Sequence, residues 1–398
     1  MAVDIAIWSL FGVTALLGLY PFGPFQATLW LVRRVRGVLP APRPGFTQEP
    51  GGRVAVLLCA YNEEAVLRDK IANTLALDPG DGSVELLLYV DGATDGTLAI
   101  AQDCADRYGD RVTLVASAER RGKAYGVRQL LARCTAPIVV FTDANVAIAP
   151  DAVTRLRRYF ADPEIGCVCG HLSYVNGEES ATAGVGALYW RLDEWTKQLE
   201  TDTGSAMGAD GSLYAARRDC LPNEAEDLFD DLFVSMSILA QGKRVVRAPD
   251  VRACEIHVSD PAEEFQRKIR ISSQSFTIHR RLWPRLRRLD AWTLYQYLGH
   301  RYLRWVGGYS LALAGVLFEI GLVRALGPVG GTAAALLPAV LLGLGWVLRV
   351  RLATGVVNIA LALLATSIGV YMSLAGRRAV TTWKPAQSVR SRFPTVSG

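Results

Sequence analysis

The chain has 398 residues, of which 51% are hydrophobic and 20% are charged, and its formal net charge is +5. This length allows one large domain or two ordinary ones, and the apolar content is high for a wholly soluble protein. The positive charges cluster beside apolar segments, which favours membrane lipids with anionic headgroups as partners and argues against nucleic acid as a partner.

The first apolar stretch, residues 5–32, contains no Lys or Arg and is followed at once by the basic run RRVR. It exceeds the roughly 20 residues needed to cross a bilayer, although Pro21 and Pro24 could divide it. It lacks the basic start and the small-residue cleavage site of a signal peptide. We therefore predict a transmembrane anchor over residues 1–36, with the next domain in the cytoplasm, because cytoplasmic flanks carry excess Arg and Lys.

The C-terminal third is again strongly apolar and predicts transmembrane helices over residues 306–376, followed by a basic tail over residues 377–398. The apolar segments lie near 306–325, 331–348 and 353–375. If all of them cross, the tail ends outside, whereas its basic residues favour the inside. Either one segment does not cross fully or the charge rule is overridden. In both cases the prediction is a multi-pass protein of a bacterial-type plasma membrane.

Between the two apolar ends lies a domain of ordinary polarity that follows a Pro- and Gly-rich linker, residues 37–52. Apolar runs such as RVAVLLCAYN, VELLLYVDGAT and PIVVFTDAN alternate with helical patterns. Strands that are apolar along their whole length predict an α/β fold with a mostly parallel sheet and helices on both faces. In such sheets ligands bind outside the carboxyl ends of the strands.

Polar side chains stand at the ends of several of these strands. In chain order they are Tyr61, Asn62 and Glu63, then Asp91 and Asp95, then Asp143 and Asn145. Each alone could be a turn or helix-cap residue. Because they recur at one rim of the predicted sheet, a binding crevice explains them better.

Asp143 follows the apolar run IVVFT, where an unpaired carboxylate would be costly. A divalent cation, Mg²⁺ or Mn²⁺, offsets that cost by binding oxygen ligands from the protein and from a diphosphate at once. Lys123 in ERRGKAYG adds a point charge suited to phosphate, and Gly122 lets the backbone approach.

Taken together, these motifs resemble those of the inverting, GT-A-type glycosyltransferases of family 2, especially membrane-bound synthases of the hyaluronan, chitin and cellulose type. CAYNEE resembles the first-strand motif, VDGATDGT the segment that holds nucleobase and ribose, RRGKAYGVRQL the Gly-Lys motif near the diphosphate, and TDAN the metal-binding Asp-x-Asp. The resemblance covers residues 53–270 and implies a GT-A (Rossmann-like) domain there that uses a nucleotide sugar of the UDP type.

The resemblance also implies roles for individual residues. The donor-binding set is Tyr61, Asn62, Glu63, Asp91, Lys123, Asp143, Arg267, Lys268 and Arg270. The metal ligands are Asp143 and Asn145, and the acceptor segment GADGSLYAARR supplies Gly208, Asp210 and Gly211. In LFDDLFVSMSILAQGKRVV, Asp231 matches the catalytic base and Asp230 its acidic neighbour.

Two departures from the family pattern matter. Asn145 replaces the second Asp of the metal motif, which removes one negative charge and predicts weaker metal affinity. Gln266 is followed by Arg270 at the spacing Gln-x-x-x-Arg, with no Trp after it, which removes the usual basis for inferring processive synthesis.

Several residues keep a second interpretation. Asp230 beside Asp231 would raise the pKa of the pair by like-charge repulsion, but two acids also suit the start of a helix. Arg267, Lys268 and Arg270 suit a diphosphate or lipid headgroups, since amphipathic interfacial helices are predicted over residues 271–305. Trp195 is a candidate for stacking on a sugar.

The leading functional hypothesis is transfer of a sugar to a growing polysaccharide for an exopolysaccharide or capsule. The alternative in the same class is transfer of one sugar to a polyprenyl-phosphate lipid acceptor. An inactive scaffold or regulatory subunit is the alternative from another class. The few predicted spans would form a channel only with help from an oligomer or a secretion partner, and no motif fixes the sugar.

Overall fold

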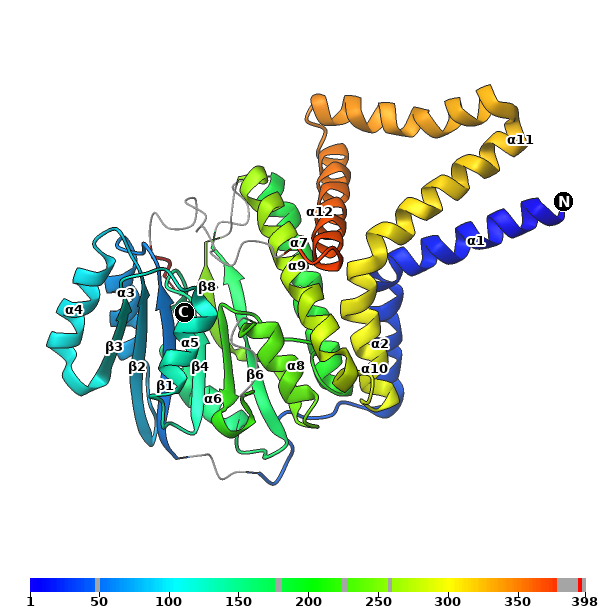
Figure 1. The fold of residues 1–398 in the computed structure, drawn as a ribbon. Coiled ribbons are helices and arrows are strands. Elements are labelled where there is room, and N and C mark those ends of the chain that lie inside the picture. The colour runs from blue at the N-terminus through cyan, green and yellow to red at the C-terminus, as the bar shows by residue number, and fades with distance from the viewer. Residues whose placement is uncertain (47–50, 176–180, 223–227, 257–259, 378–392, 396–398) are drawn as a thin grey trace.

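The fold is that of a computed structural model, which describes residues 1–46, 51–175, 181–222, 228–256, 260–377 and 393–395. Most of the predicted basic tail, together with residues 47–50 of the predicted linker, lies outside the described residues. Figure 1 shows an α/β domain on one side and a set of long apolar helices on the other.

The domain is built on an eight-stranded sheet with the order β3-β2-β1-β4-β7-β6-β8-β5. The strands are β1 (Gly52–Ala60), β2 (Gly82–Asp91), β3 (Val112–Ser117), β4 (Ile138–Thr142), β5 (Ala147–Ile148), β6 (Ile165–Tyr174), β7 (Leu213–Arg217) and β8 (Arg244–Glu255). β1 pairs in parallel with β2 and β4, β2 with β3, and β6 with β8. The prediction of a mostly parallel α/β sheet is confirmed.

The reversed strand β7 decides which segments meet at one edge. It runs antiparallel to both β4 and β6, and β5 runs antiparallel to β8. The start of β7 therefore lies at the edge where β1, β2, β4, β6 and β8 end. This arrangement brings the predicted acceptor segment, which precedes β7, to the edge that carries the predicted metal motif.

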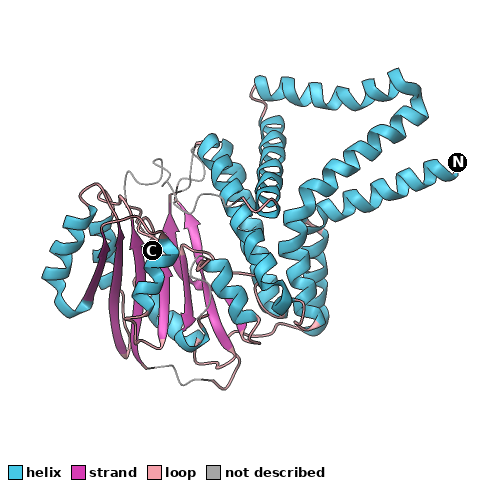
Figure 2. Cartoon of the chain, viewed as in Figure 1, coloured by secondary structure: helices cyan, strands magenta, loops and turns pink. Residues whose placement is uncertain are grey.

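Helices cover both faces of the sheet (Figure 2). They are α3 (Leu67–Leu75), α4 (Thr97–Tyr108), α5 (Lys123–Leu131), α6 (Ala152–Tyr159), α7 (Ala181–Thr203) and α8 (Asp231–Leu239). Successive residues of β1 point to opposite faces, so Val56 and Leu58 pack in one core with α3, α4 and α6. Leu57 packs in the other core, with α5 and α8.

The N-terminal apolar stretch forms two helices instead of one. α1 (Ala2–Leu19) and α2 (Pro24–Arg36) are separated by a 3₁₀ turn, η1 (Tyr20–Phe22). A candidate membrane span ends at Phe22, whereas Phe25 and Leu29 of α2 are fully buried against Leu199 of α7. The prolines therefore end the apolar helix early, and α2 packs on the domain.

The C-terminal region consists of α9 (Pro261–Leu286), α10 (Ala291–Tyr297), a π-helical turn η4 (Leu298–Tyr302), α11 (Leu303–Val347) and α12 (Arg351–Leu374). The predicted domain boundary at residue 270 falls inside α9, because α9 continues without a break from the sheet domain into the interfacial region.

Within the described residues, three helices could cross a membrane by length and composition, namely Ala2–Phe22, Ala291–Val347 and Arg351–Leu374. The second is too long for one crossing, and its α11 portion breaks at Gly327, where φ is 77° and Pro328 follows. Figure 1 shows α11 turning there and α12 coming back toward α9. At their crossing, a Cβ on Gly369 would lie 2.5 Å from the carbonyl oxygen of Ile269. The predicted segments near 306–325 and 331–348 are thus the two halves of α11.

Candidate active site

Lys123 and Asp143 form an ion pair at the carboxyl edge of the sheet. Lys123 is the first residue of α5, and Asp143 directly follows β4. Lys123 Nζ lies 2.6 Å from Asp143 Oδ1, and the two side chains are 49% and 34% exposed. Because both are open to solvent, an incoming diphosphate could compete for the lysine.

Asp91 lies behind the loop that delivers Lys123. Its two carboxylate oxygens accept the backbone N–H groups of Arg121 at 2.7 Å and of Gly122 at 2.9 Å, and the residue is 5% exposed. Gly122 has φ 90°, a conformation that favours glycine. The structure thus gives Asp91 a role in shaping this loop, and its contact with a nucleotide stays a prediction.

The residues after β1 are tied to the loop after β2. Asn62, with φ 53°, accepts the backbone N–H of Thr94 at 2.9 Å, and the backbone N–H of Glu63 donates to Thr97 Oγ1 at 2.7 Å. The guanidinium of Arg120 stacks 3.7 Å from the ring centre of Tyr61. These contacts place the predicted residues of β1 and β2 along one rim.

Glu255, the last residue of β8, joins the metal motif to the acceptor segment. Asn145 Nδ2 donates to Glu255 Oε1 at 2.9 Å, and Ser212 Oγ donates to Glu255 Oε2 at 2.9 Å. Burial, followed by the charge of Asp143, raises the pKa of Glu255. Sequence reasoning missed this residue, because β8 carries Arg244, Arg247, Asp250 and Arg252 and offers no apolar run that ends at Glu255.

Asp143 and Asn145 are residues that could hold a divalent cation together with a diphosphate. The Asn145 amide group donates to Glu255, so its carbonyl oxygen is the atom suited to a metal. In the described part of the chain, no three His, Cys, Asp or Glu side chains are grouped to hold a metal. Mg²⁺ commonly takes one or two protein oxygens and completes its shell with phosphate and water, which this pair allows.

Lys70 supports the metal motif through hydrogen bonds to the residues on both sides of it. It is fully buried on α3, and its Nζ donates to Thr142 Oγ1 at 3.0 Å and to the Val146 carbonyl at 2.6 Å, on either side of the motif. Burial lowers the pKa of Lys70 to about 7, against the opposing charge of Asp143. A lysine inside a helix gave no sequence signal for this position.

Asp230 and Asp231 begin α8 with different contacts. Asp230 caps the helix by accepting the Phe233 N–H at 2.8 Å, and its other oxygen accepts Gln274 Nε2 at 2.7 Å. Asp231 instead faces Gly211, where an added Cβ would lie 3.4 Å from Asp231 Oδ2. Asp231 is therefore the carboxylate that faces the acceptor segment.

The pKa of Asp230 is raised to about 8, first by burial and then by the charge of Asp231. Like-charge repulsion, the cause expected from sequence, acts as the second of these contributions.

The three predicted basic residues of α9 divide into two groups. Glu264 lies 3.1 Å from both Arg267 Nη1 and Lys268 Nζ, so these two side chains have a carboxylate partner on their own helix. Burial and then Arg267 lower the pKa of Arg270 to about 10, while Asp143, Asp230 and Asp231 oppose this change. Arg270 thus lies within electrostatic reach of carboxylates from both halves of the site.

In the acceptor segment, Asp210 pairs with a buried lysine. Lys197 Nζ lies 2.5 Å from Asp210 Oδ2 and 2.9 Å from Asp193 Oδ2, and its side chain is fully buried. Trp195 is 48% exposed on the same helix. Because residues two apart lie on different sides of a helix, Trp195 points away from this ionic cluster, and its stacking role stays a prediction.

Comparisons with known proteins agree with this geometry. Residues 50–273 match the model of a family described as glycosyltransferase like family 2. The chain belongs to this family, because the match covers more than half of its residues.

Two relatives show the range of activities within the similarity. The chain is 25% identical over 241 residues to a beta-monoglucosyldiacylglycerol synthase of Nostoc sp., which covers 58% of this chain and 49% of that protein. It is 20% identical over 293 residues to an N-acetylglucosaminyltransferase of Rhizobium leguminosarum bv. viciae, which covers 70% of this chain and 68% of that protein. The chain spans about half the length of the first of these curated relatives.

A solved structure has the same fold over nearly the whole chain. It is a mannosyltransferase from Pyrobaculum calidifontis in complex with GDP-Man and Mn²⁺, with a TM-score of 0.67 and 23% identity. The alignment covers 92% of this chain and 99% of that one. The likeness therefore includes helices outside the sheet domain.

Proposed function

We propose that the chain is an inverting, metal-dependent glycosyltransferase that moves a sugar from a nucleoside diphosphate to a hydroxyl acceptor at a membrane surface. The observation that carries this proposal is that Glu255 binds both Asn145 of the metal motif and Ser212 of the acceptor segment, next to Gly211, which faces Asp231. A reaction between a donor and an acceptor needs both held at one place.

The donor half suits a departing diphosphate. Lys123 and Arg270 offset the negative charge that develops as the sugar leaves, and Asp143 with Asn145 would hold a divalent cation there. The cation would supply Lewis-acid stabilisation of the phosphate oxygens. Glu255 orients the Asn145 amide so that its carbonyl oxygen can serve as a ligand.

The acceptor half suits proton removal from a hydroxyl. Asp231 faces Gly211 and accepts the proton as the hydroxyl attacks, while Asp230 is held by the helix start and by Gln274. One displacement with one base on the face opposite the leaving group inverts the anomeric carbon.

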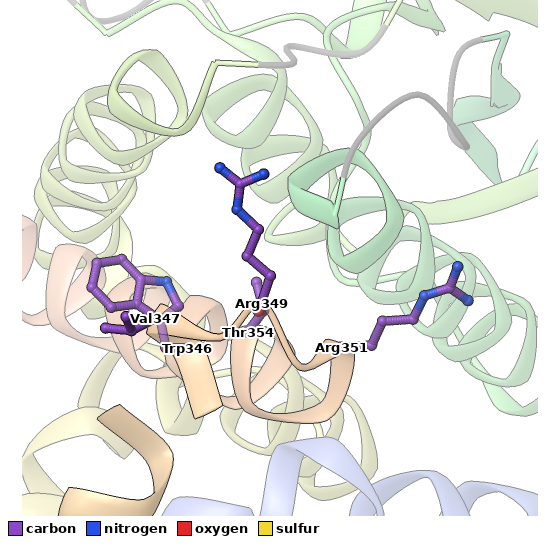
Figure 3. Close-up of a pocket in the computed structure, with 5 residues that line it drawn as sticks. All are labelled: Trp346, Val347, Arg349, Arg351 and Thr354. Atoms are coloured by element: carbon purple, nitrogen blue, oxygen red, sulfur yellow. The ribbon is translucent and has the colours of Figure 1, made fainter. Parts of the chain in front are cut away.

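The apolar helices support a multi-pass membrane protein with its catalytic domain in the cytoplasm. The candidate spans lie at both ends of the chain, and α12 ends against α9 beside the domain. In this arrangement the first half of α11 leads away from the domain and α12 returns to it. The second half of α11 links their far ends and does not cross. At the turn between α11 and α12, a pocket is lined by Trp346, Val347, Arg349, Arg351 and Thr354, and Figure 3 shows the two arginine side chains extending from this turn in different directions. Arg and Trp are typical of the membrane–water interface.

A lipid is the acceptor that the similarities favour, since a relative is named for a glucosylated diacylglycerol. Transfer of one sugar to the hydroxyl of diacylglycerol would need no channel, which suits the few candidate spans. Polyprenyl phosphate would need no channel either, but its acceptor atom is an ionised phosphate oxygen, which requires no base. Extension of a polysaccharide is the second candidate, and it would need a channel that the few candidate spans form only with a further copy or a partner.

The test uses the full chain in lipid nanodiscs that contain diacylglycerol or polyprenyl phosphate. UDP-glucose, UDP-N-acetylglucosamine and GDP-mannose are supplied in turn with Mn²⁺ or Mg²⁺, with EDTA as the metal control. Release of nucleoside diphosphate with one sugar added to the lipid supports the proposal. A long product supports the polysaccharide candidate. If no pair of nucleotide sugar and lipid is turned over, and the wild type does not differ in turnover from Asp231→Asn, the enzymatic proposal is rejected and a scaffold role is left.

A further inference from the structure

Met207 immediately precedes the acceptor segment, and both polar groups of its backbone are hydrogen-bonded to side chains. Its N–H donates to Glu200 Oε2 at 2.9 Å, and its carbonyl oxygen accepts Arg301 Nε. Met207 and Glu200 are fully buried. The start of the segment therefore has no freedom to shift without breaking a buried hydrogen bond.

Both hydrogen bonds connect Met207 to the π-helical turn η4, which immediately precedes α11. Arg301 donates directly to the Met207 carbonyl. His300 is connected to the Met207 N–H through Glu200, whose Oε1 lies 2.7 Å from His300 Nδ1. The second ring nitrogen of His300 lies 3.2 Å from Asp193 Oδ1. The π-turn places two successive side chains on partners of the same buried segment, and such turns often occur at functional sites.

Gly208 shows how closely this turn approaches the acceptor segment. It has φ 128°, and a Cβ built on it would lie 2.3 Å from Arg301 Nη2 and 3.2 Å from Leu232 Cδ1. The guanidinium thus occupies the space that a side chain would need. Leu232 follows the proposed base, so the contact runs from η4 through Gly208 to the start of α8.

The turn is also fixed from its other side. Gly299 lies against the ring of Phe25 on α2, where a Cβ would come within 2.4 Å of Cδ2. Arg304, in the first turn of α11, pairs with Asp193, which in turn binds Lys197. Since Lys197 holds Asp210, a second path of buried charges joins α11 to the acceptor segment.

We propose that the turn η4 positions the acceptor segment, with His300 and Arg301 as positioning residues for the acceptor half of the reaction. This inference rests on the proposed glycosyl transfer. It assigns the membrane-entry turn a specific task, which is to set Gly208 to Gly211 against Asp231 so that the acceptor hydroxyl meets the base.

The test compares Arg301→Gln with Arg324→Gln, its matched control. Arg324 lies far along α11 and pairs with Asp4 at 2.7 Å, so its variant removes an arginine and an ion pair away from the acceptor segment. The readouts are KM for the lipid acceptor, KM for the nucleotide sugar, kcat, and donor hydrolysis without acceptor. The donor and lipid are the pair that the wild-type chain turns over.

Arg301→Gln is expected to lower kcat/KM for the acceptor by about 10- to 100-fold while donor KM and donor hydrolysis stay within about twofold. Arg324→Gln should match the wild type, and Arg301→Lys should recover part of the loss. If Arg301→Gln does not fold, His300→Gln is measured in the same way, together with hydrogen exchange at the Met207 amide. An equal loss for donor and acceptor, or no loss, would overturn the inference. Absence of wild-type turnover would instead reject the proposed function.

Discussion

The donor half and the acceptor half of the site each contain an ion pair of nearly the same length, but the two pairs differ in their exposure to solvent. Lys123 and Asp143 lie 2.6 Å apart with side chains 49% and 34% exposed. Lys197 and Asp210 lie 2.5 Å apart with side chains 0% and 19% exposed. An exposed pair contributes little to stability and can open for a substrate, whereas breaking a buried pair leaves a costly unpaired charge. The same chemistry thus serves binding in one half and fixed geometry in the other.

The largest expected effect belongs to the base. Asp231→Asn keeps the size of the side chain but cannot accept a proton, so transfer should fall by about a thousandfold. Nucleotide binding and the melting temperature should stay near the wild-type values. Product formation over a time course checks the rate. Asp230→Asn is the matched control and should lose less, since Asp230 caps a helix and faces Gln274.

The buried pair is tested through stability. Lys197→Met leaves Asp193 and Asp210 without their shared cation, which should lower the free energy of unfolding by about 3–5 kcal/mol. The control is Arg68→Gln, which removes an exposed pair with Asp103 and should cost about 0–1 kcal/mol. Denaturation of both variants in the same detergent measures the difference. Equal losses would remove the distinction between the two kinds of pair.

The raised pKa of Asp230 predicts that stability depends on pH. This pKa is about 8, so folded Asp230 binds a proton that the unfolded chain releases near pH 4. Stability from this group is therefore present at low pH and is lost as the pH rises toward 8. Asp230→Asn removes this titration, so the fall in the free energy of unfolding between about pH 4 and pH 8 should become smaller. Denaturation at several pH values measures it, and an unchanged fall would contradict this assignment.

The smallest expected effect is that of Asn145→Asp, which restores the second acid of the family motif. The added charge should tighten Mn²⁺ binding, while turnover at saturating Mn²⁺ changes by no more than about threefold. A titration of activity against Mn²⁺ concentration separates the two quantities. Loss of activity at all Mn²⁺ concentrations would show that the Asn145 contact with Glu255 matters more than its role as a metal ligand.

The donor half could be predicted from sequence because its parts lie at the ends of strands. Each apolar run ends in polar residues, and parallel pairing brings those ends to one edge, so the place of Asp143 follows from local pattern. Lys123 begins α5 and was indicated by the Gly-Lys motif instead. Glu255 carried no such signal, because β8 has charged residues along its length, and the parallel pairing of β6 with β8 places it at this edge.

The acceptor half could not be predicted to the same depth, because its contacts join residues far apart in the chain. His300 reaches Glu200 across 100 positions, and Arg301 reaches Met207 across 94. Nothing in the apolar pattern distinguishes a π-turn from a continuous helix. The early end of the first apolar helix was visible as Pro21 and Pro24, whereas the packing of α2 on α7 was not.

The most direct test of the account is binding of UDP or GDP to Asp143→Ala by calorimetry, with and without Mn²⁺. In the wild type Mn²⁺ should strengthen the binding of at least one of these nucleotides, and in the variant this gain should disappear while the melting temperature holds. Binding in Asp143→Ala that is as strong and as dependent on Mn²⁺ as in the wild type would contradict the donor site proposed at this edge of the sheet.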